Sequence, residues 1–254
     1  MTCTQALLSL LLITPCTDGG TPAMDVAVAE ALADPQRFAA DRSRDHLRKP
    51  EQVLAFFEIK PGMRVLDLFS GGGYYTEILS LVVGPTGSVV AQNNQAYLDY
   101  MKDENASRYA DNRLPNVERL ITEADSMQLE DASFDATLAI LTWHDFYYGG
   151  GASGWPAVNE SALVDKLCSA MKPGAVLGII DHVAQRDSDP ALTGEELHRV
   201  DPERIKMDLA GSCFKLEAEA QFLRNPADPL NLVVMDPAIR GKTDQVVLKY
   251  RRDR

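Results

Sequence analysis

Short apolar runs alternate with segments of helical spacing along most of this chain. The apolar runs, which suit buried strands, cover residues 64–68, 88–92, 116–122, 133–141 and 175–180. Between them, apolar residues recur at helical spacing from Tyr74 onward and in residues 98–110 and 159–171. Strands and helices that alternate in this way form a mostly parallel sheet covered on both faces. The pattern therefore predicts a doubly wound α/β fold.

The two ends of the chain depart from this alternation. Residues 195–210 have helical spacing, and two strand-like segments, 214–223 and 245–251, follow with no helix between them. They predict an antiparallel C-terminal hairpin added to the sheet. Residues 24–60 predict a helical lead-in that ends at a Pro-Gly turn. With 254 residues and 45% hydrophobic content, the chain can form one sizeable core, so we expect one catalytic-size domain over residues 61–254.

The first residues have features of an export signal. Residues 6–13 form an apolar run of signal-peptide length that is too short to span a bilayer. We expect a leader over residues 1–23, cleaved near residues 21–23 or lipid-anchored through the lipoprotein-like segment 13–16, and a periplasmic protein. No Lys or Arg precedes the apolar run. The alternative is therefore a leader that does not function and a cytoplasmic protein.

The cysteines and the net charge bear on the compartment of the protein and on the classes of partner that it can bind. Cys168 and Cys213 are either buried small hydrophobic residues or, in an oxidising compartment, a disulfide. The net charge of -12 opposes attraction to phosphate backbones, and no basic run interleaved with aromatic residues is present, so we expect no nucleic-acid partner. No apolar run is long enough for a transmembrane span. The sequence does not indicate an oligomeric state.

A glycine-rich turn at residues 70–73 lies between the first strand and the helix that begins at Tyr74. It lacks the third glycine of a dinucleotide fingerprint, because Thr76 occupies that position, and it lacks the ending of a P-loop. Asp67 can accept a hydrogen bond from a ligand ammonium, and the turn N–H groups can bind a carboxylate. The charged segment 41–48 is either a solvated face or the source of an Arg for that carboxylate.

Three motifs in order carry a resemblance to a known family. They are V-L-D-L-F-S-G-G-G at residues 65–73, S-F-D-A-T-L-A-I-L at 133–141 and L-C-S-A-M-K-P-G-A-V-L-G-I-I-D at 167–181. The chain resembles the class I S-adenosylmethionine-dependent methyltransferases. K-P-G-M-R-V-L-D, H-D-F-Y-Y and R-N-P-A-D-P are similar to motifs of a bacterial group of predicted methyltransferases with leader peptides. The resemblance implies a seven-stranded Rossmann-like sheet of order 3-2-1-4-5-7-6 with strand 7 antiparallel.

The resemblance also implies a site for S-adenosylmethionine. The methionine portion would lie at Asp67, Ser70, Gly71, Gly72 and Gly73. The ribose would lie at Asn93, or at Gln92 in the other alignment, and the adenine at Asp125 and Ser126. Phe69 stands where the common motif has a glycine, and Asn93 stands where it has an acid. An amide accepts a hydroxyl proton without charge assistance, so we expect a weaker ribose contact.

The acceptor side is expected at the neighbouring strand ends. In the implied order, His144 and Asp145 converge with Asp181 and His182 at the carboxyl edge of the sheet. His144 or His182 would act as a base for a small-molecule acceptor, with Asp145 or Asp181 fixing the tautomer. A structural role and a divalent metal are the alternatives, but no local ligand spacing supports a metal. Residues 149–154 would form a lid or a tolerated surface insertion.

Two other functions remain open at this point. An exported binding module that kept the methyltransferase fold without catalysis is favoured by the conflict between a cytoplasmic methyl donor and a leader peptide. A nicotinamide-dependent oxidoreductase is disfavoured by Thr76 and by the final hairpin.

Overall fold

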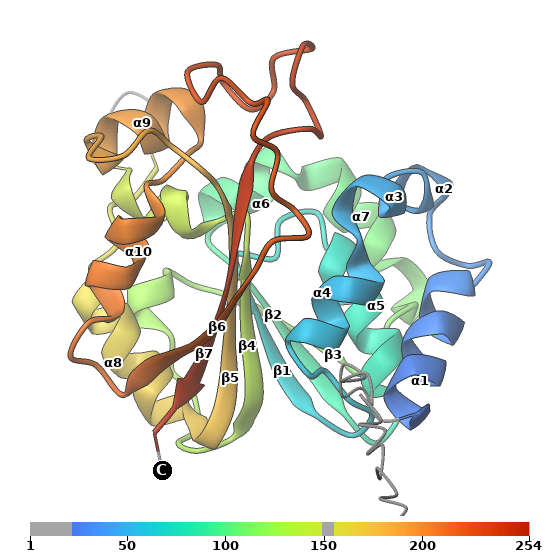
Figure 1. Ribbon diagram of the computed structural model, residues 1–254. Helices are drawn as coiled ribbons and strands as arrows, with labels where there is room; N and C mark the ends of the chain where they lie inside the picture. The colour runs from blue at the N-terminus through green and yellow to red at the C-terminus, as the bar shows by residue number, and fades with distance from the viewer. Residues whose placement is uncertain (1–21, 149–154, 254) are drawn as a thin grey trace, which may run out of the picture.

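The computed structural model describes residues 22–148 and 155–253 (Figure 1). The expected leader before residue 22 and the expected loop at residues 149–154 lie outside the described residues. A central sheet separates two layers of helices, and the long connection between the last two strands rises above the sheet (Figure 1). Among the described helices, none has the length and hydrophobicity that crossing a membrane requires.

The sheet has seven strands in the order β3-β2-β1-β4-β5-β7-β6. All neighbouring pairs are parallel except β5 with β7 and β6 with β7. The doubly wound α/β fold, the strand order and the antiparallel hairpin are therefore confirmed. The strands are β1 (Arg64–Leu68), β2 (Ser88–Asn93), β3 (Val117–Ile121), β4 (Phe134–Ile140), β5 (Met171–His182), β6 (Phe214–Ala220) and β7 (Gln245–Arg252).

The helices cover the two faces of this sheet through two hydrophobic cores. Alternation along β1 sends Leu66 and Leu68 into one core with α8 (Glu160–Ala170) and α10 (Pro202–Leu209). Val65 enters the other core with α1 (Pro22–Ala33), α4 (Pro50–Phe56) and α5 (Tyr74–Val83). The remaining helices are α2 (Ala39–Arg42), α3 (Asp45–Arg48), α6 (Gln95–Tyr100), α7 (Lys102–Arg108) and α9 (Pro190–Leu197).

Three predicted elements differ in the structure. The helix predicted over residues 98–110 is divided at Met101 into α6 and α7. The helix predicted over residues 195–210 is also two helices, α9 and α10, because Pro202 begins a helix and cannot continue one. The helix predicted over residues 159–171 ends at Ala170, and residues 172–174, which follow it, lie inside β5 beside a register irregularity in the pairing with β4.

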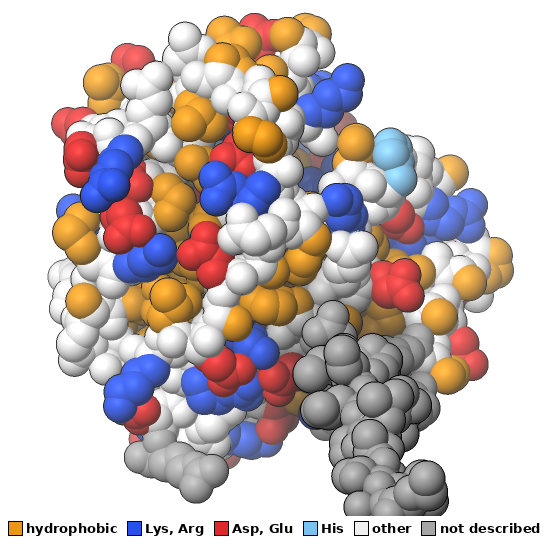
Figure 2. Space-filling model, viewed as in Figure 1, with side chains coloured by type: hydrophobic (Ala, Val, Ile, Leu, Met, Phe, Trp, Pro, Cys, Tyr) orange, Lys and Arg blue, Asp and Glu red, His pale blue; other side chains and the backbone are white. Residues whose placement is uncertain are grey.

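Cys168 and Cys213 form a disulfide, with their Cα atoms 5.9 Å apart. The bond joins α8, a helix that covers one face of the sheet, to the residue before the edge strand β6. The disulfide alternative is therefore confirmed, and these cysteines are not free hydrophobic residues. Over the face in Figure 2, acidic and basic side chains lie beside one another. Among the ion pairs of the described residues, Glu217 of β6 pairs with Lys249 and Arg251 of β7.

Candidate functional site

The glycine turn, residues 69–73, follows β1 and enters α5. Its backbone takes left-handed φ angles at Phe69 (47°), Gly71 (57°) and Gly73 (79°). A left-handed φ costs little for glycine but roughly 1 kcal/mol or more for phenylalanine. Packing holds Phe69 there, because its buried ring lies 5.4 Å from the ring of Phe146 and 5.8 Å from that of Tyr97. Phe69, which stands where the common motif has a glycine, thus keeps a backbone conformation typical of glycine.

Asn93 and Gln92, at the end of β2, brace the turn. Asn93 Oδ1 accepts a hydrogen bond from Gly71 N at 2.9 Å, and Asn93 Nδ2 donates to Ser70 Oγ at 2.9 Å. Gln92 Oε1 accepts from Phe69 N at 3.0 Å. Both side-chain amides are buried, and both make hydrogen bonds to groups of the protein itself. Asn93 is a positioning residue for the turn in this structure, and its contact with a ribose stays a prediction.

Asp67 is a buried carboxylate at the end of β1. Its Oδ2 accepts a hydrogen bond from Thr76 Oγ1 at 2.6 Å, and among the described residues Oδ1 has no partner. Burial raises the pKa of Asp67 to about 7, although the Thr76 hydroxyl acts in the opposite direction. A buried carboxyl in this condition gains most from a cationic ligand group.

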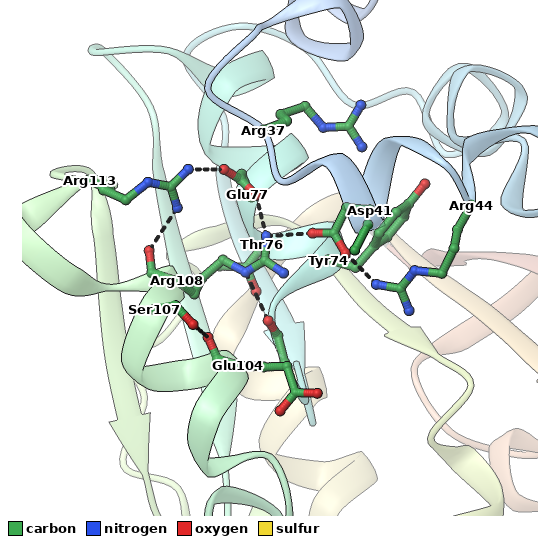
Figure 3. Close-up of polar contacts among 12 residues, drawn as sticks. Arg37, Asp41, Arg44, Tyr74, Thr76, Glu77, Glu104, Ser107, Arg108 and Arg113 are labelled. Atoms are coloured by element: carbon green, nitrogen blue, oxygen red, sulfur yellow. Dashed lines mark hydrogen bonds and ion pairs between the residues drawn. The ribbon is translucent and has the colours of Figure 1, made fainter.

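Arg108 of α7 fastens the outer side of the turn (Figure 3). Its Nε donates to Gly72 O at 2.8 Å, and its Nη1 pairs with Asp41 of α2 at 2.7 Å and with Glu77 of α5. Arg113 pairs with Glu77 at 2.6 Å. A Cβ at Gly73 would lie 3.1 Å from Arg108 Nε, so this close packing favours glycine there. The network joins α2, α5 and α7 around the turn.

A cavity of about 830 Å³ opens between the glycine turn and the N-terminal helices α2 and α3. It is lined by Asp67, Ser70, Gly71 and Gly72 on the turn side and by Asp41, Arg44 and Arg48 on the helix side. Its size lies in the usual range for cofactor and small-molecule sites. The cavity reaches Thr142 at the end of β4, so it adjoins the segment that carries His144.

Arg48 of α3 lines the cavity without an acidic partner among the described residues. Its guanidinium lies 4.6 Å from the centre of the Tyr74 ring, and among the described residues no carboxylate pairs with it. Arg44, by contrast, pairs with Asp41. Burial lowers the pKa of Arg48. The charged segment therefore contributes one unpaired guanidinium to the cavity wall.

The histidine cluster, His144, Asp145, Asp181, His182 and His198, lies at the carboxyl ends of β4 and β5. His144 Nδ1 lies 2.7 Å from Asp181 Oδ1, and His144 N donates to Asp181 Oδ2 at 2.9 Å. His144 Nε2 lies 3.2 Å from Asp145 Oδ1. The predicted convergence of the two strand ends is therefore confirmed, and the buried imidazole of His144 lies between two carboxylates.

The pKa values of the two predicted histidines, His144 and His182, are shifted in opposite directions. Burial by itself lowers the pKa of His144, but Asp181 and Asp145 outweigh it and raise that pKa to about 10. Burial lowers the pKa of His182 to about 3, and its Nδ1 lies 2.7 Å from Thr243 Oγ1. At neutral pH His144 is a cation held by carboxylates, and His182 is a neutral, weakly basic imidazole.

His198 and Tyr148 also belong to this region. His198 lies between α9 and α10 with a φ of 55°, and its Nδ1 lies 2.6 Å from Tyr148 Oη. Its ring centre is 5.5 Å from that of His144. His198 was missed because it fell inside the single helix predicted over residues 195–210. The Asp201-Pro202 pair, a typical helix start, was the available signal.

Two comparisons relate this geometry to known proteins. The family model of protein-L-isoaspartate(D-aspartate) O-methyltransferases matches residues 38–137, which include the glycine turn but not the histidine cluster. A SAM-dependent methyltransferase from Aquifex aeolicus superposes with a TM-score of 0.58 at 23% identity, covering 90% of this chain and 98% of that one.

Two further solved structures agree. A proposed methyltransferase from Bacillus halodurans superposes with a TM-score of 0.56 at 17% identity, covering 82% of this chain and 99% of that one. A SAM-dependent methyltransferase from Mesorhizobium loti gives 0.54 at 16% identity, covering 84% and 98%. The chain has the Rossmann-like methyltransferase fold.

Within this methyltransferase fold, the predicted cofactor residues divide into two groups. Asp67, Ser70, Gly71 and Gly72 line the cavity. Gly73, Asn93, Asp125 and Ser126 do not line it. Asp125 Oδ2 instead accepts a hydrogen bond from Asn159 N at 2.9 Å, at the start of α8, and Ser126 donates to Asp125. The adenine contact of Asp125 and Ser126 stays a prediction.

Other side chains near the strand ends and on the late connection have structural partners. Trp143 and Phe146 are fully buried in the core of the methyltransferase fold. Arg224 pairs with Asp244 at 2.7 Å. The R-N-P-A-D-P motif therefore has a structural explanation, since its Asp228 also pairs with the buried Arg199 at 2.9 Å.

Proposed function

We propose that the protein is an S-adenosylmethionine-dependent methyltransferase that acts on a small-molecule acceptor. The observation that carries the proposal is Asp67, a buried carboxylate with an unpartnered oxygen, at the wall of a cavity of about 830 Å³ beside the glycine turn. The fold shared with SAM-dependent methyltransferases supports it. So does the family match, which covers β1, β2 and the glycine turn beside this cavity.

The residues of the cavity suit the two charged ends of an amino acid. Asp67 Oδ1 would accept from the ligand's ammonium group. Ser70, Gly71 and Gly72 place backbone close to the cavity, and Arg48 supplies an unpaired guanidinium for the ligand's carboxylate. When bound, S-adenosylmethionine supplies a methyl group on a sulfonium, which an acceptor lone pair displaces in line.

The protonation states of the histidine cluster limit the chemical class of the acceptor. His144 is already protonated at neutral pH, and His182 is a weak base because its pKa is about 3. Neither suits the removal of a proton from an alcohol before transfer. We therefore propose an acceptor whose lone pair is free at neutral pH, such as a thiolate or a weakly basic amine that is unprotonated there. In this proposal His144 acts as a buried cation rather than as the predicted base.

A binding and turnover experiment tests this function. Titration calorimetry with S-adenosylmethionine should show binding to the wild type, weakened by about 10-fold in Arg48→Gln, because one charge-assisted hydrogen bond to the carboxylate is lost. Arg42→Gln is the matched control, since Arg42 is exposed and does not line the cavity. Formation of S-adenosylhomocysteine with amines and thiols, but not alcohols, is the expected turnover. Absence of donor binding would overturn the proposal.

We also propose that the protein works in an oxidising, extracytoplasmic compartment. The disulfide between Cys168 and Cys213 supports this location, because such bonds are rare in reducing compartments. The apolar run at residues 6–13 supports it independently. Fractionation of cells, followed by labelling of free thiols before and after reduction, should find the full-length gene product outside the cytoplasm with Cys168 and Cys213 protected. Labelled thiols in a cytoplasmic fraction would contradict the location.

A further inference from the structure

We propose that His144, Asp145 and His198 form a binding site for a divalent transition metal ion of the zinc class. One candidate ligand atom from each of the three side chains lies within 4.8 Å of the other two. Two imidazoles and one carboxylate form a donor set that such ions take in proteins. The site is distinct from the cavity at the glycine turn, and it is not needed for the methyl transfer proposed above.

Asp181 prepares His144 for this role. The carboxylate lies 2.7 Å from His144 Nδ1 and also accepts from the backbone N of His144. With Nδ1–H donated to Asp181, Nε2 is the free ligand atom, as in the carboxylate–histidine pairs that orient metal ligands. Nε2 lies 3.2 Å from Asp145 Oδ1. Ligand atoms around a tetrahedral zinc ion lie about 3.3 Å apart, given bond lengths of about 2.0 Å. Two of the three ligands are therefore already at metal-binding spacing.

His198 reaches the pair from a different segment of the chain. Its left-handed backbone, with a φ of 55°, turns the chain between α9 and α10, and its ring is nearly perpendicular to that of His144, at 87°. Tyr148 Oη lies 2.6 Å from Nδ1 of His198, which leaves Nε2 for an ion. His198 is only partly buried, so a solute can approach from this side. Its ligand atom lies within 4.8 Å of the other two, so a shift of its ring by at most about 1.5 Å would complete the ligand spacing of about 3.3 Å.

Buried carboxylates on both sides of His144 also favour a cation at this place. Asp181 Oδ1 lies 2.7 Å from Nδ1 of His144, and Asp145 Oδ1 lies 3.2 Å from Nε2. All three side chains are buried. Carboxylates in these positions can ligate a metal ion or orient its histidine ligand.

Metal titration of the full chain, first treated with a chelator, tests the site without any methyl donor. Cobalt should give the visible absorption of a low-symmetry histidine site, and zinc should displace it. His198→Ala should weaken zinc binding by more than the roughly 10- to 100-fold expected for Asp181→Asn, because it removes a ligand rather than an orienting group. His46→Ala is the matched control, since His46 is exposed on α3.

His198→Gln provides a second variant that keeps the volume and polarity of the site, so that loss of binding cannot be attributed to local collapse. Both variants should melt cooperatively, as measured by circular dichroism. Zinc affinity that is unchanged in both His198 variants would contradict the site. So would the absence of a cobalt spectrum in the wild type, whether or not the protein binds S-adenosylmethionine.

Discussion

The glycine turn and the histidine cluster lie at the same edge of the sheet but are built in different ways. The turn is continuous in sequence, and its braces from Gln92 and Asn93 come from the next strand. The histidine cluster is assembled from residues 144–145, 181–182 and 198, with Thr243 and Tyr148 as further partners. The turn is therefore set by local backbone geometry, whereas the cluster depends on long-range packing and on charge.

This difference predicts separate sensitivities. Changes at the turn should alter donor binding with moderate effects on folding, because the cavity and its unpartnered groups lie there. Changes around the cluster should alter stability first, because its charges are buried and mutually satisfied. The predictions below are ordered by expected size.

Reduction of the disulfide should have the largest effect on stability. The bond between Cys168 and Cys213 closes a loop of 45 residues, and for such a loop the chain-entropy account gives about 4 kcal/mol of stabilisation. Urea unfolding with and without reductant measures it. A Cys168→Ser, Cys213→Ser variant should match the reduced wild type and show no further response to reductant. An unchanged midpoint on reduction would show that the helix layer on the histidine-cluster side needs no cross-link.

Asp181→Asn should reduce the free energy of unfolding by about 3 kcal/mol at pH 7, because it leaves a buried imidazolium with one carboxylate fewer. Asp187→Asn is the control, since that side chain is exposed. The folded pKa of His144, about 10, is above its ordinary value of 6.5, so its contribution to stability is complete below about pH 6.5. It is lost as the pH rises toward 10.

Denaturant unfolding at pH 7 and pH 10 separates charge from packing in the histidine cluster. The wild type should lose stability over this interval, and Asp181→Asn should lose less because its His144 pKa is already lower. Equal losses in the two proteins would show that His144 is not the group that titrates.

Asn93→Ala should cost about 2 kcal/mol, because Gly71 N loses its only described acceptor while it remains buried. It should also weaken donor binding, since the turn is then free to relax. Thermal melting and calorimetry measure the two effects, with Gln95→Ala as an exposed amide control. Reduced stability with unchanged donor affinity would separate Asn93 from the site.

Gly73→Ala should cost about 1 kcal/mol more than Gly211→Ala. Both glycines have left-handed φ angles, 79° and 76°, so they share the backbone penalty. Only the Cβ at residue 73 meets another group, Arg108 Nε at 3.1 Å, whereas the space around Gly211 is open. Equal melting temperatures for the Gly73→Ala and Gly211→Ala variants would show that the Arg108 side chain moves away from the new Cβ without a measurable cost.

The strands and their order could be predicted because each buried strand is a short apolar run next to a turn residue, and because three motifs occur in the order of the methyltransferase fold. The glycine turn was found for the same reason. The pairing of His144 with Asp181 followed from strand order alone, since β4 and β5 are neighbours. Local pattern and topology together were sufficient for these features.

Other features depend on side-chain partners that spacing does not reveal. The use of Asn93 as a brace requires the position of Gly71 N, and the role of Asp125 at the start of α8 requires the position of Asn159. His198 enters the cluster because α9 ends before it and a new helix begins at Pro202. The apolar periodicity of residues 195–210 suggested one continuous helix and so concealed this break. The cysteine pairing required knowing that the end of α8 lies beside the start of β6.

The pH dependence of donor binding tests the central claim most directly. Burial raises the pKa of Asp67 to about 7, so near neutral pH a protonated Asp67 must lose its proton to bind an ammonium group. Between pH 8 and pH 6 its ionised fraction falls about 10-fold, and the affinity for S-adenosylmethionine should fall by about the same factor. Calorimetry at the two pH values should show this change in the wild type, and weaker binding with no such change in Asp67→Asn. Wild-type affinity in Asp67→Asn at both pH values would contradict the account.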